Sequence, residues 1–340
     1  MKAALIGLGM VSQTYGAAIR ASQTVSLKSA FAPSLESQER FICAFPDICA
    51  ELARDVQQIA DDPEVDFAIV TTPPNARREI VEMLAAAGKP ILMEKPVERT
   101  LDAAQAIVEL CEDLDVPLGI VFQHRTRPIL AELHDKLADL GALIAVEVAV
   151  PWWRPQSYYD EPGRGSFERD GGGVLISQAI HTLDLMLSLT GPVSEVTAMC
   201  VTSAFHSMEG EDFVSAGLSF ANGAVGHLFA TTASFPGKGE TITLHCQNGS
   251  VRLAAGGLEI AFHDGHSETL GTQQSSGSGA DPMAFTCDWH QAVIEDFADA
   301  LNESHEPLVT GREALQVHAL ISALEEAGRS GKRVKVSRIP

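Results

Sequence analysis

The spacing of apolar residues divides the chain into two parts. Over residues 1–122, short apolar runs that predict strands alternate with amphipathic stretches that predict helices, a pattern typical of βαβ units and a parallel sheet. The expected strands are 3–6, 27–31, 67–70, 91–93 and 118–122. Three helices are expected: one that follows the first strand and ends at residue 19, one over 76–87 and one over 101–114. We therefore expect a doubly wound α/β domain of the Rossmann type over residues 1–122.

The second part, from residue 123 to residue 340, has a different pattern. Its expected strands are 143–150, 193–201, 212–220, 224–233, 241–246, 250–254 and 258–263, and its expected helices are 128–139, 174–189, 288–302 and 311–328. Asn222-Gly223 and Asn248-Gly249 are strong hairpin signals, which favour a meander. The prediction is an α+β domain with a mostly antiparallel, open-faced sheet. Residues 151–173 and the Gly/Ser-rich segment 273–282 are expected loops, and helix 311–328 is a candidate to pack back on the first domain.

Composition and charge exclude several classes of protein. A length of 340 residues favours two domains, and the formal charge of −21 argues against nucleic acid and anionic membranes as partners. The chain contains no apolar run of about 18 residues, so a membrane span is not expected. The apolar N-terminus leads directly into a glycine turn, which indicates a first strand rather than a signal peptide. Six scattered cysteines without a C-x-x-C pair favour free thiols. We expect a cytoplasmic protein.

A glycine loop follows the first expected strand. Gly7-x-Gly9-x-x-Ser12 departs from the dinucleotide-binding fingerprint only at its third position, where serine adds little volume. Because it follows a strand and opens a helix, it predicts a site for the pyrophosphate of NAD or NADP, with Met10 and Val11 in the turn.

The cofactor preference depends on the end of the second strand. That strand ends in Ala32-Pro33-Ser34, without the carboxylate that usually rejects a 2′-phosphate, so the sequence favours NADP and makes Ser34 a candidate contact. Glu36 lies nearby and weakens this inference.

Several further motifs occur in a fixed order along the chain. They are Thr72-Pro73-Pro74-Asn75, Glu94-Lys95-Pro96, Phe122-Gln123-His124-Arg125, and Gly171-Gly172-Gly173 followed by His181-x-x-Asp184. With the glycine loop, this order resembles the glucose–fructose oxidoreductase / inositol dehydrogenase / MocA family over nearly the whole chain. The segment from Trp152 to Gly165 looks like the branch that acts on sugars and nucleotide-linked sugars.

The resemblance implies a role for each matching residue. Lys95 is the expected active-site lysine and His181 the expected acid/base group. The expected cofactor contacts are Gly7, Gly9, Met10, Val11, Ser34, Thr72, Pro73, Asn75, Glu94, Lys95, Gln123, Trp153 and Arg154, with Arg125 along the nicotinamide side, and the expected substrate contacts are Asp184, Tyr159, Arg164 and Ser177. Inositol dehydrogenase-like members have an acid at the position of Ser177, so serine argues against cyclitol chemistry.

The residue types themselves suit the oxidation of a secondary alcohol. A histidine can accept the hydroxyl proton near neutral pH, and an ammonium group stabilises the developing alkoxide without a metal. His263-Asp264-Gly265-His266 predicts a hairpin turn rather than a metal site. The leading hypothesis is an NAD(P)-dependent sugar oxidoreductase, assembled as a homodimer or homotetramer through the open sheet face. Two alternatives stay open: a glycosidase that uses transient oxidation, and a non-catalytic nucleotide-sensing regulator.

Overall fold

The computed structural model describes residues 1–48, 51–254, 256–271 and 286–339. It divides into two compact units: Met1–Gln123 with Thr286–Leu315, and His124–Phe285 with Gln316–Pro340. Residues 286–315 therefore belong to the first unit, whereas the sequence analysis assigned them to the second domain. The expected loop at 273–282 lies outside the described residues. No helix among the described residues is long and apolar enough to cross a membrane.

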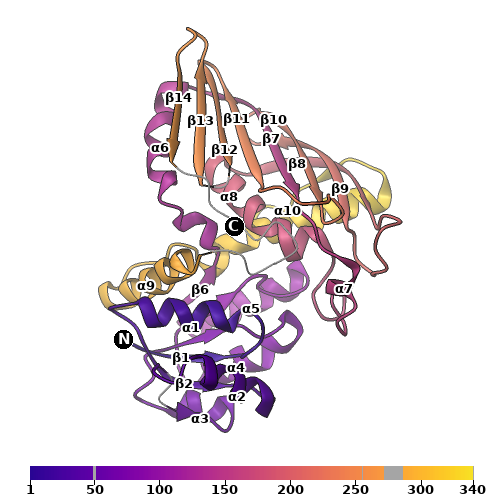
Figure 1. Cartoon of the computed structure of the whole chain (residues 1–340). Coiled ribbons are helices and arrows are strands. Elements are labelled where there is room, and N and C mark those ends of the chain that lie inside the picture. Colours follow the sequence, from indigo (N-terminus) through magenta and orange to yellow (C-terminus); the bar gives the residue numbers. More distant parts are fainter. Residues whose placement is uncertain (49–50, 255, 272–285, 340) are drawn as a thin grey trace. The chain divides into compact units, whose positions relative to one another are not determined.

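The first unit is built on a six-stranded parallel sheet in the order β3-β2-β1-β4-β5-β6 (Figure 1). Its strands are β1 (Lys2–Ile6), β2 (Ser26–Phe31), β3 (Glu51–Leu52), β4 (Phe67–Val70), β5 (Ile91–Glu94) and β6 (Leu118–Val121). Its helices are α1 (Ser12–Ala21), α2 (Leu35–Ala44), α3 (Val56–Asp61), α4 (Arg77–Ala86), α5 (Leu101–Asp113) and α9 (Asp288–Glu303). The order of the strands is that of a doubly wound nucleotide-binding fold, so this part of the fold prediction is confirmed.

The core of the first unit depends on a helix from far along the chain. Every residue of β4 and β5 is buried, as expected for parallel strands covered on both faces. Phe297 of α9 packs edge-on against Phe67 of β4, with ring centroids 5.4 Å apart. The apolar side of α9 thus packs into the same core as the N-terminal strand β1.

The second unit contains a nine-stranded sheet in the order β14-β13-β12-β11-β7-β10-β9-β8-β15. Its strands are β7 (Leu143–Pro151), β8 (Val193–Val201), β9 (Phe213–Phe220), β10 (Val225–Thr231), β11 (Thr241–Cys246), β12 (Gly249–Ala254), β13 (Gly257–Phe262), β14 (Ser267–Gly271) and β15 (Val334–Lys335). Strand β7 lies between β10 and β11 and runs parallel to β10. The expected meander is therefore interrupted, although every other pair in this sheet is antiparallel.

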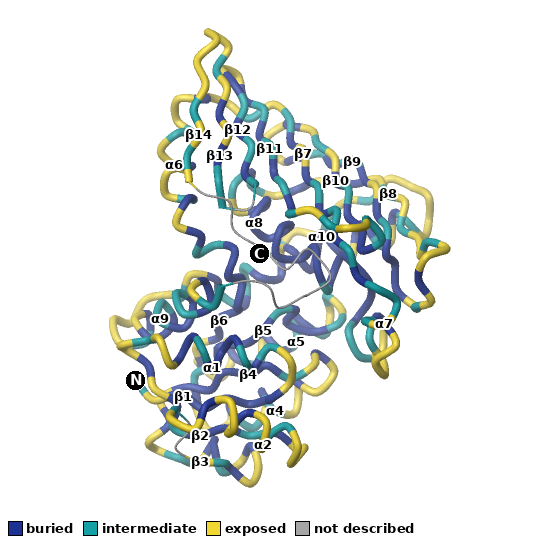
Figure 2. The backbone as a smooth tube through the Cα atoms, in the orientation of Figure 1, coloured by how far each residue is buried: buried dark blue, intermediate teal, exposed yellow. Residues whose placement is uncertain are grey.

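Helices lie against one face of this sheet, and the other face is open. The helices of the second unit are α6 (Ile129–Leu140), α7 (Gln156–Tyr159) and α8 (Ile180–Thr190), and α10 (Gly311–Ser330) belongs to it from Gln316 onward. α8 contacts β7 and β11, and α6 contacts β13. Residues along β9 alternate between buried and more exposed (Figure 2), which confirms the prediction of an open-faced sheet.

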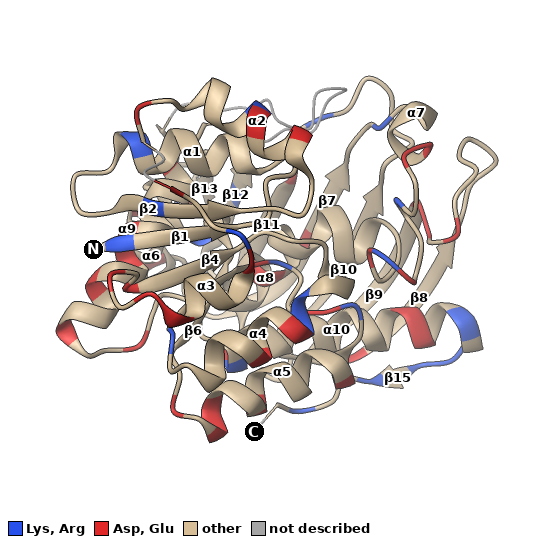
Figure 3. Cartoon of the chain, turned by 90° about the horizontal axis from the view of Figure 1, so that it is seen from below, with Lys and Arg blue, Asp and Glu red and all other residues tan. Residues whose placement is uncertain are grey.

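The acidic residues are spread over helices and loops of both units rather than gathered in one patch (Figure 3). A local cluster of cations can therefore still attract an anionic ligand, despite the formal charge of −21.

Candidate active site

The glycine turn after β1 has the geometry of a phosphate cradle. Gly7 has a φ of +104°, and a Cβ atom there would lie 2.8 Å from the backbone nitrogen of Thr72, so only glycine fits. A Cβ atom at Gly9, by contrast, would meet no heavy atom within 4 Å. α1 begins directly after this turn, and no side chain caps its N-terminal amides. The backbone nitrogens of Ser12 and Thr14 donate to the carbonyls of Gly9 and Val11 within this turn. The open space over Gly9 at the start of α1 fits the pyrophosphate of a dinucleotide.

The other predicted cofactor residues of the first unit lie at the carboxyl edge of the same sheet. The Thr71 hydroxyl donates a 2.6 Å hydrogen bond to the carbonyl of Gly7, which ties the end of β4 to the glycine turn. Thr72, Pro73 and Asn75 follow β4, Glu94 is the last residue of β5, and Lys95 directly follows it. The structure therefore brings these residues to the edge where open parallel sheets bind ligands. Gln123 is buried just after β6.

Ser34, the predicted ribose contact, immediately precedes helix α2. Its hydroxyl accepts a hydrogen bond from the backbone nitrogen of Ser37 at 3.3 Å, so it is the N-cap of this helix. Arg40 donates to the hydroxyl of Ser37 at 3.3 Å from the next turn. The segment after the second strand therefore offers a serine hydroxyl at the start of α2 and an arginine in the turn beyond Ser37.

A buried polar cluster lies next to Lys95, and the sequence analysis did not find it. The hydroxyl of Tyr15 in α1 donates a 3.0 Å hydrogen bond to Oε1 of Glu94, and Nε2 of His290 in α9 lies 3.9 Å from the same oxygen. Burial raises the pKa of Glu94 and lowers the pKa of His290 to about 3, where the charge of Lys95 adds to the effect. His290 is therefore neutral over the physiological range, and the residue before Lys95 carries a buried carboxyl group.

In the second unit, His181 and Asp184 occupy successive turns of α8, and both are buried. The His181 ring lies against that of His124, with centroids 5.0 Å apart. Asp184 forms a bidentate ion pair with Arg125, in which both nitrogen–oxygen distances are 2.8 Å. The carboxylate of Asp184 is therefore held by an arginine.

His124 belongs to a buried network around Glu240 that was also missed. Arg127 donates to Oε1 of Glu240, Trp152 Nε1 donates to Oε2 at 3.3 Å, and His124 Nε2 lies 4.0 Å from Oε1. Glu240 is only 3% exposed, and its charge is balanced by that of Arg127. No local motif marks Glu240, because it lies 88 residues from Trp152 and 113 residues from Arg127 along the chain.

The residues expected along the loop after β7 contact one another and also Thr232 and His206, which lie outside the loop. The Tyr159 hydroxyl lies 2.8 Å from Oγ1 of Thr232, and burial raises the pKa of Tyr159. Arg154 is 3% exposed, and its guanidinium lies over the ring of Tyr158, at 5.5 Å. Arg164 lies over the same ring at 4.2 Å. Both guanidinium groups therefore lie close to the Tyr158 ring.

Trp153 belongs to a second group of aromatic rings. Its ring centroid lies 4.7 Å from that of Phe205 and 5.2 Å from that of Phe235. Phe235 is 76% exposed, so this group reaches the surface of the second unit. The rings of Phe205 and Phe235 are inclined to that of Trp153 by 53° and 84°, so they pack in tilted and edge-to-face arrangements.

The Gly171–Gly173 turn rests on a buried acid. Glu211 accepts hydrogen bonds from the backbone nitrogens of Gly173 at 3.1 Å and Leu175 at 2.9 Å. A π-helix over Leu175–Ala179 follows, where one regular helix was expected, and it includes the half-buried Ser177. π-Helical turns are frequent at functional sites, and this one directly precedes the turn that carries His181.

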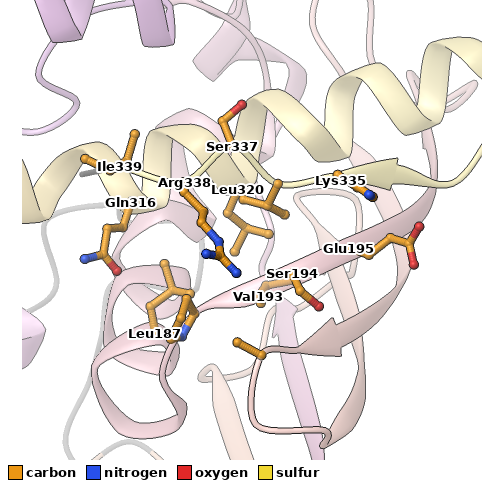
Figure 4. Close-up of a pocket in the computed structure, with 13 residues that line it drawn as sticks. Leu187, Val193, Ser194, Glu195, Gln316, Leu320, Lys335, Ser337, Arg338 and Ile339 are labelled. Carbon is orange, nitrogen blue, oxygen red and sulfur yellow. The ribbon is translucent and has the colours of Figure 1, made fainter.

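A cavity of about 710 Å³ also lies in the second unit. It is lined by the end of α8, by β8 and α10, and by residues 335–339, and Figure 4 shows Arg338 extending toward Leu187 and Val193. None of the predicted catalytic or substrate residues lines it. Among the residues that the structure describes, no group of three His, Cys, Asp or Glu side chains could hold a metal ion.

Comparison with known proteins identifies the class to which this geometry belongs. Residues 1–122 match the model of an oxidoreductase family with an NAD-binding Rossmann fold, and residues 136–252 match the model of the GFO/IDH/MocA C-terminal domain. The chain belongs to the GFO/IDH/MocA family of oxidoreductases, as its motifs predicted.

Individual relatives are dehydrogenases of sugars. The chain is 27% identical to the D-apiose dehydrogenase of Rhizobium rhizogenes over 300 residues, which cover 83% of this chain and 82% of the relative. It is 28% identical to the levoglucosan dehydrogenase of Pseudarthrobacter phenanthrenivorans over 258 residues, or 65% of each chain. The crystal structure of the WlbA dehydrogenase from Bordetella pertussis, in complex with NADH and UDP-GlcNAcA, superposes with a TM-score of 0.85 at 25% identity, covering 99% of this chain and 98% of the other.

Proposed function

We propose that this protein is an NAD(P)-dependent oxidoreductase that interconverts a secondary alcohol and a ketone on a sugar, a sugar derivative or a sugar nucleotide. The observation that carries the proposal is the position of Lys95, which directly follows β5 at the sheet edge shared with Gly7 and Thr72. An ammonium group at this edge can stabilise the alkoxide that develops as the alcohol loses its proton. The names of the relatives support a sugar-like substrate.

The proposed reaction converts the carbinol into a ketone by loss of a hydride and a proton. A bound nicotinamide cofactor supplies the hydride acceptor. The imidazole of His181 accepts the hydroxyl proton, a role that suits a histidine near neutral pH. The burial of His181 at 7% exposure limits access of bulk water to that proton. In the reductive direction, the same imidazole returns the proton to the new alkoxide.

The Arg125–Asp184 ion pair is the proposed anchor for substrate hydroxyl groups near His181. A carboxylate accepts hydrogen bonds from hydroxyl groups, and a guanidinium donates them, so the pair can serve both kinds of partner. The two hydrogen bonds from Arg125 also fix the orientation of the Asp184 carboxylate, which lies one turn beyond His181 in α8. Ser177 offers a hydroxyl where an acid would favour cyclitol substrates.

The proposed cofactor preference is for NADP, with NAD also accepted. The second strand is followed by Ala32, Pro33 and Ser34, without a carboxylate to repel a 2′-phosphate. Arg40 lies six residues beyond Ser34 in α2, where its guanidinium donates to the Ser37 hydroxyl and provides a cation. NADH is bound by the related WlbA dehydrogenase, so both cofactors belong in the assay.

The experiment that tests this proposal follows the absorbance of the reduced nicotinamide with NAD and with NADP, in both directions. The substrate panel consists of free sugars, cyclitols, sugar acids and sugar nucleotides. Turnover of at least one sugar-type compound is expected, and activity confined to cyclitols would contradict the substrate assignment. Product release without net cofactor reduction would indicate the transient-oxidation glycosidase instead. Cofactor binding without any turnover would favour the regulator.

We also infer that the protein is a cytoplasmic homodimer or homotetramer whose subunits meet through the open sheet face. Met199, Val201 and Val225 are 51%, 43% and 57% exposed on the strands β8 and β10, and the rings of Phe213 and Phe229 pack 5.6 Å apart on β9 and β10. Apolar surface of this kind is commonly covered by a second subunit. Light scattering at micromolar concentration should therefore give at least a dimer, and a monomer would contradict the inference.

A further inference from the structure

Arg77 is a buried arginine with no part in the reaction described above. It is the first residue of α4, and only 2% of it is exposed. Burial lowers the pKa of Arg77 to about 10, while the nearby charge of Glu94 opposes this effect. The guanidinium therefore stays charged near neutral pH. A buried charge is unfavourable unless its hydrogen-bonding groups are all used, so the partners of Arg77 are informative.

The partners of Arg77 are backbone carbonyl groups at the carboxyl edge of the first sheet. Nε and Nη2 donate to the carbonyl of Thr72 at 3.0 and 2.8 Å, and Nη2 also donates to Lys95 at 3.5 Å. Nη1 donates to the carbonyls of Glu94 and Pro96. These five contacts match the five N–H groups of a guanidinium.

The four carbonyl groups surround the predicted catalytic residue. Three of them belong to Glu94, Lys95 and Pro96, so the guanidinium holds the backbone before and after Lys95. The fourth belongs to Thr72, in the loop that contains the predicted cofactor contacts Pro73 and Asn75. One planar side chain thus joins the end of β5 to the end of β4. A lysine could not replace it, because an ammonium presents three donors from a single point.

We propose that Arg77 is a positioning residue that fixes the direction of the Lys95 side chain and the cofactor loop at Thr72. This proposal rests on the proposed function. Arg77 itself touches no reacting atom, so its contribution comes through the backbone that it holds. A displacement of a catalytic group by about 1 Å can cost roughly 100-fold in rate, which sets the scale of the expected effect.

The test compares Arg77→Lys and Arg77→Ala with the neighbouring variants Arg78→Lys and Arg78→Ala. Arg78 is the matched control because its side chain is 57% exposed and pairs only with Glu82 among the described residues. We expect kcat to fall by about 10- to 100-fold in the Arg77 variants, because Lys95 is no longer held in place. The Kd for NADH, from fluorescence titration, should also rise, because Thr72 loses its anchor. Both Arg78 variants should behave as wild type.

Chemical rescue separates positioning from a general loss of structure. Guanidinium chloride at tens of millimolar should restore part of the kcat of Arg77→Ala and leave Arg78→Ala unchanged. If Arg77→Ala does not fold, Arg77→Lys, which keeps the charge and most of the volume, supplies the measurement. Folded Arg77 variants with wild-type kcat and wild-type Kd would overturn the proposal. A wild-type protein without turnover would instead count against the proposed function, and the Kd for NADH would still decide whether Arg77 holds the loop.

Discussion

The replacement of Glu325 by glutamine tests the electrostatics beneath the Gly171–Gly173 turn. Glu325, in α10, is half-buried, and its Oε1 would lie 3.4 Å from a Cβ atom on Gly172. Burial and the neighbouring carboxyl of Glu211 raise the pKa of Glu325 from 4.5 to about 7, and Arg329 offsets only part of this. The folded protein therefore keeps a proton that the unfolded chain releases between these pH values.

The sign of the effect on stability follows from this difference. Because the folded state binds more protons between pH 4.5 and about 7, the free energy of unfolding falls as the pH rises through this range. At about 1.4 kcal/mol per pKa unit, the loss is on the order of 3 kcal/mol and is complete above about pH 7. A glutamine side chain does not ionise, so the free energy of unfolding of Glu325→Gln should fall less over the same pH range. Glu211 contributes to the same trend in both proteins, because burial raises its pKa as well.

Urea unfolding measured at about pH 5 and about pH 8 gives the required comparison. We expect Glu325→Gln to be more stable than wild type by a few kcal/mol at the higher pH, and the difference to shrink at the lower pH. Glu326→Gln is the control, because this neighbour is an exposed partner of Arg329. Parallel pH dependences for Glu325→Gln and wild type would refute the reasoning.

Three further substitutions test separate parts of the structure. Gly9→Ala should fold normally, because its Cβ atom meets open space. It should weaken NADH binding by about tenfold or more in a fluorescence titration, because the methyl group occupies the space over the turn. An unchanged affinity would exclude this turn as the phosphate cradle. Tyr15→Phe removes the hydrogen bond to buried Glu94 and should lower the free energy of unfolding by about 1–3 kcal/mol in urea, so a wild-type value would contradict the assigned contact. Gly173→Ala places a Cβ atom 1.8 Å from the carbonyl of Glu211 and should cost at least about 1–3 kcal/mol, which a thermal melt at wild-type midpoint would disprove.

The parts of the account that sequence alone could predict are those with a local signal. The glycine turn, the strand that ends just before Lys95 and the hairpins at Asn222-Gly223 and Asn248-Gly249 each depend on residues close together in the chain. The parallel sheet of the first unit and the mostly antiparallel sheet of the second unit were predicted from such local patterns, and the structure contains both. The position of β7 between β10 and β11 could not be predicted, because strand pairing between residues so far apart in the chain leaves no mark in apolar spacing.

The buried polar groups around Lys95 were missed for two physical reasons. Tyr15 and His290 meet Glu94 from helices that lie far apart in sequence, and a histidine in an amphipathic helix has no feature that indicates a carboxylate partner. Arg77 begins a helix next to the exposed Arg78, and arginines at such positions usually face solvent. Only the structure distinguishes the arginine that points inward from its neighbour.

The most direct test of the central claim is the activity of Lys95→Met on the sugar that the wild-type protein oxidises, measured together with the affinity for the cofactor. Loss of one preorganised electrostatic group in an active site typically costs about 100- to 1,000-fold in kcat. The account predicts a loss of that size in Lys95→Met, with NADH affinity close to that of wild type and with an unchanged melting temperature. A folded Lys95→Met variant that keeps wild-type kcat would contradict the assignment of Lys95 as the catalytic cation.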